Sequence, residues 1–145
     1  MSTYQDLTYD QCLELLRGEQ VGRLAMVADD QPIILPVNYR VVQIDSILWI
    51  AIRTRPGNEL DQPGVRCAFE IDGYDTDHRR GWSVLVRGTL QRVDPDAAGF
   101  RERFDPEPWL TEGRESWLVV EAYRVTGREV TGTEPAWAFV TEAYL

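Results

Sequence analysis

The chain has 145 residues, a formal net charge of −9 and an isoelectric point near 4.6. This acidity argues against nucleic acid as a partner, because neutralisation of phosphates supplies most of that affinity. The sequence has no apolar run of about 18 residues that would span a membrane, and its polar start, MSTYQDLTYD, lacks the features of a secretory signal. We therefore expect one cytoplasmic domain over residues 1–145, with no membrane partner.

The N-terminal part predicts one helix followed by strands. Residues 8–18, TYDQCLELLRG, carry an apolar stripe of helical period, with Thr8 as N-cap, Gln11 as its capping-box partner and Gly18 as the end. Pro36 is typical of a bulge or a sheet edge, and DDQP and IDS predict tight turns. Apolar alternation or continuity predicts three strands: 21–28, 33–43 and 47–53.

The rest of the chain adds strands and a late helix. Gly88 predicts a bulge or a close backbone approach inside a strand, and Asp94 followed by Pro95 predicts a helix start. These signals give strands 65–74, 81–93 and 116–130, and a helix over 94–104. Six strands with two helices predict a mostly β fold, a small antiparallel β-barrel with peripheral helices.

Metal and nucleophilic chemistry have few candidate residues. The cysteines are Cys12 and Cys67, and the one histidine, His78, lies in the polar loop DTDHRR. This set lacks the spacing of a zinc site, and a Ser-His-Asp triad would depend on that loop histidine. We expect no metal site and no catalytic side chain. All fifteen basic residues are arginines, so an anion site would use guanidinium or backbone N–H groups.

The segment IAIRTRPGNEL, residues 50–60, ends an apolar strand in a cationic turn. Arg53–Asn58 supplies two guanidinium groups, a hydroxyl and a glycine turn that would enter one helical turn. Such groups bind phosphate. The competing interpretation is that both arginines are exposed cations paired with the many carboxylates.

Four ordered segments carry a family resemblance: LPVNYRV, ILWIAIRTRPGNEL, CAFEIDGYD and GWSVLVRGTLQRV. Together they resemble the pyridoxamine 5′-phosphate oxidase-like superfamily, over roughly residues 10–130. The similarity is greatest to its short bacterial branch, which includes nitroimidazole-reductase-like proteins. The resemblance implies a six-stranded antiparallel split β-barrel of the FMN-binding type. It also implies a homodimer with flavin at the subunit interface, and Trp137 in the C-terminal segment is expected to pack on its own domain or on the dimer mate.

The resemblance also implies a set of cofactor-binding residues. The strand with Pro36, Val37, Asn38 and Tyr39 would run under the flavin ring, with Arg53 and Thr54 beside its pyrimidine end or the ribityl phosphate. Gly57, Asn58 and the next position, Glu59, would hold the phosphate, and Trp82 and Ser83 would come from the partner subunit. The family pattern usually has lysine at Glu59, whose carboxylate opposes phosphate binding. Arg55 would either substitute for that lysine or pair with Glu59.

These features favour an FMN-dependent oxidoreductase acting on a small-molecule redox substrate, in which the cofactor supplies the chemistry. Two alternatives remain open. A deazaflavin-dependent reductase of the same fold would use further cations, such as Arg79, Arg80 and Arg87, for the anionic tail of that coenzyme. A non-catalytic flavin-binding protein, or one with a vestigial site, would fit Glu59 and the lack of acid/base residues.

Overall fold

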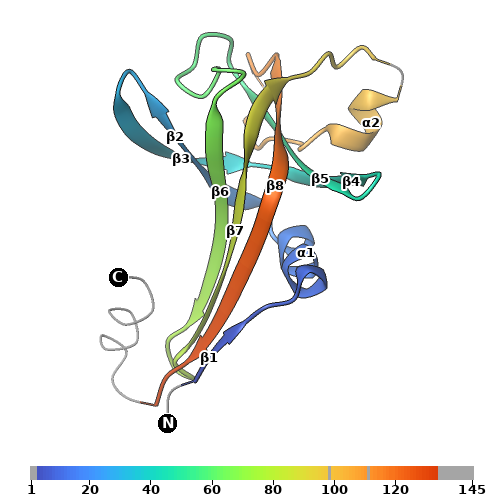
Figure 1. Ribbon diagram of the computed structural model, residues 1–145. Coiled ribbons are helices and arrows are strands. Elements are labelled where there is room, and N and C mark those ends of the chain that lie inside the picture. The colour runs from blue at the N-terminus through green and yellow to red at the C-terminus, as the bar shows by residue number, and fades with distance from the viewer. Residues whose placement is uncertain (1–2, 98, 111, 134–145) are drawn as a thin grey trace.

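The computed structural model describes residues 3–97, 99–110 and 112–133, so Trp137 lies outside the described residues. These residues form a mostly antiparallel β fold with short helices (Figure 1). The elements are β1 (Thr3–Asp6), α1 (Tyr9–Gly18), β2 (Val21–Ala28), β3 (Gln31–Asn38), β4 (Arg40–Ile44), β5 (Ile47–Thr54), β6 (Arg66–Asp75), β7 (Arg80–Arg92), α2 (Phe100–Phe104) and β8 (Ser116–Thr131).

The strands join in the order β3-β2-β6-β7-β8-β5-β4, and β1 pairs with the last residues of β8. Figure 1 shows β6, β7 and β8 as long neighbouring strands, with the β2–β3 and β4–β5 hairpins on either side and α1 beside the lower half of β8. The predicted split-barrel fold class is confirmed. The described chain has eight strands where the sequence predicts six.

One extra strand arises because the predicted strand 33–43 is divided at Tyr39. β3 pairs with β2, whereas β4 pairs with β5 on the other side of the fold. Tyr39 makes this corner: its side chain is buried, and its Oη donates a 2.5 Å hydrogen bond to the Leu16 carbonyl of α1. β3 ends the sheet, so Pro36 lies on an edge strand as predicted, within a continuous register.

The predicted helix 94–104 is wrong in its first half. α2 spans only Phe100–Phe104 and begins after Gly99, whose φ is 71°. Asp94 does not cap it; its side chain accepts a hydrogen bond from the Asp96 N–H within a turn. By contrast, Thr8 and Gln11 form the predicted capping box of α1.

The interior is filled mainly by the inward faces of α1, β2, β5, β6, β7 and β8. Its largest fully buried side chains include Phe69, Leu16, Leu24, Ile50 and Ile52. The predicted irregularity at Gly88 is confirmed, because the β7–β8 register shifts between Arg87 and Gly88. A Cβ atom at Gly88 would lie 2.4 Å from the Glu121 carbonyl oxygen, so the two backbones approach closely there. A second cluster, around Trp117 and Phe104, joins β5 and β8 to α2.

Candidate functional site

A cavity of about 420 Å³ lies where the ends of β3 and β5 meet the segment after α2. We call it the β3–β5 pocket. Its lining is mostly apolar, with a few polar and cationic residues: Val21, Leu35, Pro36, Val37, Asn38, Arg53, Thr54, Asn58, Leu60, Pro108, Trp109, Leu110 and Arg114. A pocket of this size and composition is typical of a site for a small organic ligand.

The structure brings together half of the residues expected at the cofactor. Six of the twelve predicted residues line the pocket: Pro36, Val37, Asn38, Arg53, Thr54 and Asn58. Tyr39 does not, because its side chain is buried against α1. Burial is the main cause that raises the pKa of Tyr39 above its ordinary value. Tyr39 therefore acts as a structural corner of the fold.

Arg53 reaches the pocket with its guanidinium already engaged. Its Nη1 bonds Asp105 Oδ1 at 3.1 Å, and its Nε donates to the Arg114 carbonyl at 3.1 Å. The guanidinium also stacks over the Trp117 ring, 4.7 Å from the ring centroid. With its side chain only 16% exposed, Arg53 joins Asp105 and Arg114 to the end of β5.

The turn after β5 also uses its polar groups internally, and within the described chain no helix follows it before β6. The Gly57 N–H donates to Asp61 Oδ2 at 3.2 Å, and the Asn58 N–H donates to the Arg55 carbonyl at 3.0 Å. Burial by itself raises the pKa of Asp61, but hydrogen bonds from Arg92 and from the Gly57 N–H lower it overall. The turn therefore does not enter a helix in the described chain, and the N–H groups of Gly57 and Asn58 are already hydrogen-bonded. Phosphate binding by this turn stays a prediction.

Gly57 and Glu59 line a different hollow, of about 400 Å³. Its other lining residues include Asp29 and Asp61, so that hollow is acidic. Among the described residues Glu59 does not line the β3–β5 pocket, and no ion pair joins it to Arg55. This chain has Glu59 where the family pattern usually has lysine, but its carboxylate is not part of the lining of the β3–β5 pocket.

One wall of the pocket was not predicted from the sequence, and it is formed by Pro108, Trp109, Leu110 and Arg114. Trp109 is 71% exposed at the pocket, and its backbone N–H donates to Asn38 Oδ1 at 2.9 Å. The Asn38 side chain in turn donates to the Gln20 carbonyl at 3.2 Å, so Asn38 joins this wall to the start of β2. The available signal was the apolar pair Trp109-Leu110 within the polar run DPEPWLTEGRE.

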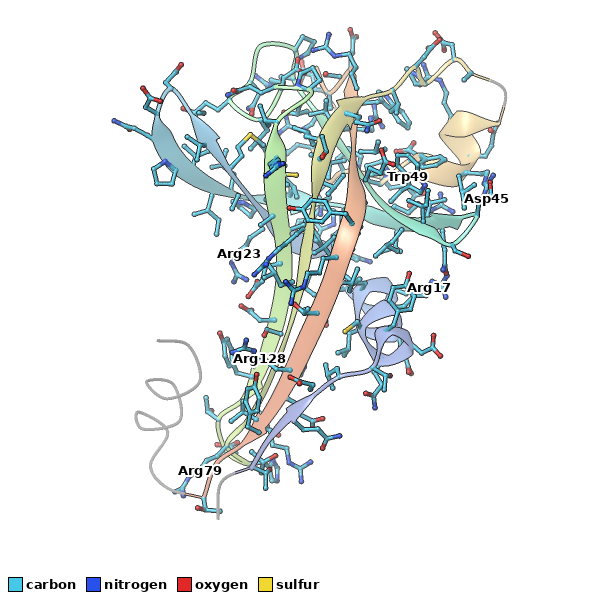
Figure 2. The ribbon with its side chains drawn as sticks, viewed as in Figure 1. Arg17, Arg23, Asp45, Trp49, Arg79 and Arg128 are labelled. Atoms are coloured by element: carbon cyan, nitrogen blue, oxygen red, sulfur yellow. The ribbon has the colours of Figure 1, made fainter. Side chains whose placement is uncertain are left out.

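The predicted partner-subunit residues lie elsewhere on the chain. Trp82 packs against Gly73 on β6, where an added Cβ atom would lie 2.7 Å from the indole ring. Ser83 lines a separate groove of about 670 Å³ on the face of β6, β7 and β8, together with Arg87, Arg124 and Arg128. Arg79 lies in the turn between β6 and β7, at the far end of these strands (Figure 2).

A carboxylate pair sits on this same face. Arg23 Nη1 bonds Glu70 Oε1 and Asp72 Oδ2, each at 3.1 Å, and Figure 2 shows Arg23 further up the strands than Arg128. Burial, followed by the neighbouring Asp72 carboxylate, raises the pKa of Glu70 to about 7, although Arg23 opposes the shift. Glu70 therefore keeps its proton to a higher pH in the folded chain than its ordinary value of 4.5 allows.

This shift predicts a pH-dependent loss of stability. Between the ordinary pKa of 4.5 and about 7, the folded chain binds more protons at Glu70 than the unfolded chain does. The contribution of Glu70 to the free energy of unfolding therefore falls as pH rises through that range. Glu70→Gln should flatten this fall, measured by urea unfolding at a series of pH values. Glu129→Gln is the matched control, and a fall of unchanged slope in Glu70→Gln would contradict the prediction.

Comparison with known proteins assigns the family. The sequence model for the family described as pyridoxamine 5′-phosphate oxidase matches residues 8–134. The chain belongs to the pyridoxamine 5′-phosphate oxidase family. This confirms the resemblance of the four sequence segments, and it places every lining residue of the β3–β5 pocket within the matched region.

The chain is also similar to individual proteins and to solved structures. The Mycobacterium tuberculosis protein Rv0080 is 29% identical over 131 residues, covering 84% of this chain and 82% of its own. The FAD binding protein from Mycobacterium smegmatis is 26% identical with a TM-score of 0.64, covering 88% of this chain and 98% of that one. The Corynebacterium diphtheriae protein DIP1874 is 26% identical with a TM-score of 0.70, covering 86% of this chain and 96% of that one.

Proposed function

We propose that this protein binds a flavin nucleotide in the β3–β5 pocket and acts as a flavin-dependent oxidoreductase on a small molecule. The observation that carries the proposal is the pocket itself, an apolar slot with polar groups at the ends of β3 and β5. A flavin has matching chemistry, since its ring is flat and largely apolar and its side chain is polar and anionic. The FAD-binding relative of the same fold supports this ligand class.

The protein's part in this function is binding and orientation. β3 is the end strand of the sheet, and such a strand presents unpaired backbone N–H and C=O groups on its free side. In our proposal these groups meet the polar edge of the ring, while Leu35, Val37 and Leu60 exclude water from its apolar part. Trp109 offers an exposed aromatic surface for stacking.

The described lining of the pocket contains no Asp, Glu, His or Cys side chain. Its described lining residues are apolar, amide, hydroxyl or guanidinium. A bound flavin would itself supply hydride or electron transfer. The chain then has to hold the ring, exclude water and balance charge, and Arg53 and Arg114 are the cations in the lining.

The part of the ligand recognised in our proposal is riboflavin 5′-phosphate, which FMN and FAD share. FMN is the smallest ligand that carries it. The test is a titration of flavin-stripped protein with FMN, FAD and a deazaflavin coenzyme, followed by flavin and tryptophan fluorescence. We expect one FMN or FAD per chain at micromolar or lower concentration. Failure of both to bind would overturn the proposal, and binding of the deazaflavin alone would assign the cosubstrate alternative.

Catalysis needs its own measurement. Flavin-loaded protein is mixed anaerobically with NADH or NADPH, and the loss of flavin absorbance is followed, then its return on adding an electron acceptor. We expect reduction and reoxidation in repeated cycles. Tight binding without reduction by either nucleotide or return of electrons to an acceptor would assign a non-catalytic flavin-binding role.

We also propose a homodimer in which Trp82 and Ser83 of a second copy approach the pocket. Val27 and Ile34 support a covered face, since each is 60% exposed on one face of the β2–β3 hairpin. Exposed apolar patches of this kind mark interaction sites. Sedimentation should give a dimer at micromolar concentration, and a monomer would remove the shared-site part of the proposal.

A further inference from the structure

We propose that Arg114 is the residue that binds the phosphate of the flavin nucleotide, in place of the turn Arg53–Asn58 that the sequence indicates. The inference rests on the proposed function, because it names a ligand contact within the same pocket. The polar groups at this end of the pocket differ in whether they are still available to an anion.

The guanidinium of Arg53 is not available to an anion. It is paired with Asp105, stacked on Trp117 and bonded to the carbonyl of residue 114. An anion placed beside Arg53 would therefore meet a cation whose charge is already balanced by a carboxylate 3.1 Å away. Such a pair offers little net attraction to a second anion.

In the glycine turn, the N–H groups of Gly57 and Asn58 are not available to an anion either. The N–H of Gly57 donates to Asp61, and the N–H of Asn58 donates to the Arg55 carbonyl. The Asp61 carboxylate is itself paired with Arg92 at 2.7 Å, and its side chain is only 5% exposed. The ion pair therefore holds Asp61 in the position where it accepts the Gly57 N–H. Freeing the Gly57 N–H for a phosphate would cost the buried Asp61 carboxylate one of its hydrogen bonds.

Arg55 does not supply a cation to the pocket either. Arg55 packs against Gly113, where an added Cβ atom would lie 3.5 Å from its Nε, and it is not part of the pocket lining. Arg114, the next residue after Gly113, does line the pocket. The ion pairs of the described chain include no partner for Arg114, and the pocket lining contains no Asp or Glu.

Within the part of the chain that the structure describes, Arg114 is therefore the cation of the pocket lining that no carboxylate balances. Its backbone is fixed, because its carbonyl accepts the bond from Arg53 Nε at 3.1 Å. The planar guanidinium binds phosphate oxygens in a two-pronged manner, which suits a terminal phosphate ester. Arg53 is then the positioning residue that sets the place of Arg114.

The test compares FMN with riboflavin, which has the same ring and ribityl chain but no phosphate. In Arg114→Ala we expect the affinity for FMN to fall by about 10- to 100-fold, the usual effect of losing a charged hydrogen bond. The affinity for riboflavin should stay at the wild-type value, which also shows that the pocket is intact. Arg55→Ala is the matched variant, and both of its affinities should be unchanged.

The salt dependence of FMN binding gives a second readout. Wild-type affinity should fall as NaCl rises, and Arg114→Ala should lose most of that dependence, because screening acts on the charge that was removed. An unchanged FMN affinity in Arg114→Ala, an equal loss of FMN and riboflavin, or a loss in Arg55→Ala instead would each overturn the assignment. A wild-type protein that binds neither FMN nor riboflavin would contradict the proposed function itself.

Discussion

Arg53→Ala should abolish binding of FMN and of riboflavin alike, by about 100-fold or more, and lower the free energy of unfolding by about 2–4 kcal/mol. The reason is that Arg53 bonds Asp105 and the Arg114 carbonyl, which lie on either side of Trp109 in the chain, and so holds this wall of the pocket against β5. Its loss leaves Asp105 without its cation and removes one of the two guanidinium groups that lie over the Trp117 ring. Flavin fluorescence titration and urea unfolding measure the two effects.

Two further variants distinguish the effect of the Arg53–Asp105 ion pair from the effect of removing a positive charge elsewhere. Arg53→Ala combined with Asp105→Ala should cost less than the sum of the single changes, with a coupling of about 1–3 kcal/mol, because no carboxylate is then left without its partner. Arg55→Ala, on the exposed turn, should change the free energy of unfolding by less than about 0.5 kcal/mol. Retention of riboflavin binding by Arg53→Ala would show that the segment does not depend on Arg53.

The equal loss of both ligands distinguishes Arg53 from Arg114. A residue that touches only the phosphate changes FMN binding and spares riboflavin. A residue that places a whole wall of the pocket changes both. The sequence predicts Arg53 as a ligand of the flavin; in the structure its bonds fit a positioning role, and direct contact with the ring edge stays a prediction.

The parts of the fold that depend on near neighbours could be predicted from the sequence. The capping box at Thr8 and Gln11, the turn at Asp45-Ser46 and the apolar run of β5 each depend on residues a few positions apart. The division of the strand at Tyr39 could not be predicted in this way. The residues on both sides have β patterns, and only the choice of partner, β2 before the corner and β5 after it, ends one strand and begins the next.

The site, like the fold, could be predicted only where it depends on residues that are near one another in the sequence. The end of β5 is evident from the pattern, and it carries Arg53 and Thr54 into the pocket. Pro36, Val37 and Asn38, at the end of β3, were expected at the site only from the family resemblance of LPVNYRV. The state of Arg53 depends on Asp105 and on the carbonyl of Arg114, which lie 52 and 61 residues later in the chain. No local pattern links these residues. The Gly57–Asp61 hydrogen bond, by contrast, spans four residues, so an acidic side chain shortly after a glycine turn is a local signal for it.

Among the described residues the lining has two cations and no carboxylate, in a chain of net charge −9. The acidic groups around the pocket are each engaged or lie outside its lining: Asp105 is paired with Arg53, Asp61 is paired with Arg92, and Glu59 lines the separate acidic hollow. An anionic ligand would thus enter a local environment opposite in charge to the chain as a whole. Selectivity for an anion would come from that placement of charge, because overall charge would repel it.

Phe69→Ala should be among the most destabilising single changes, lowering the free energy of unfolding by about 3–5 kcal/mol. The ring is fully buried on β6, contacts Tyr39 edge to face at a centroid distance of 4.7 Å, and covers Gly22 of β2. Removing the ring leaves a cavity beside Tyr39, the corner residue at which β3 ends. The residues just before this corner line the β3–β5 pocket. Urea unfolding measures the loss, with Tyr123→Ala, an aromatic residue 64% exposed, as the control.

Gly22 makes this prediction sharper, because its place in the strand depends on the same ring. A Cβ atom at Gly22 would lie 2.2 Å from Phe69 Cζ, so Gly22→Ala in the wild-type chain should cost about 1–3 kcal/mol through overpacking. In the Phe69→Ala chain that clash is absent, and the added methyl group fills part of the cavity. Gly22→Ala should then be neutral or stabilising. Additive costs in the double variant would show that the ring does not set the glycine requirement.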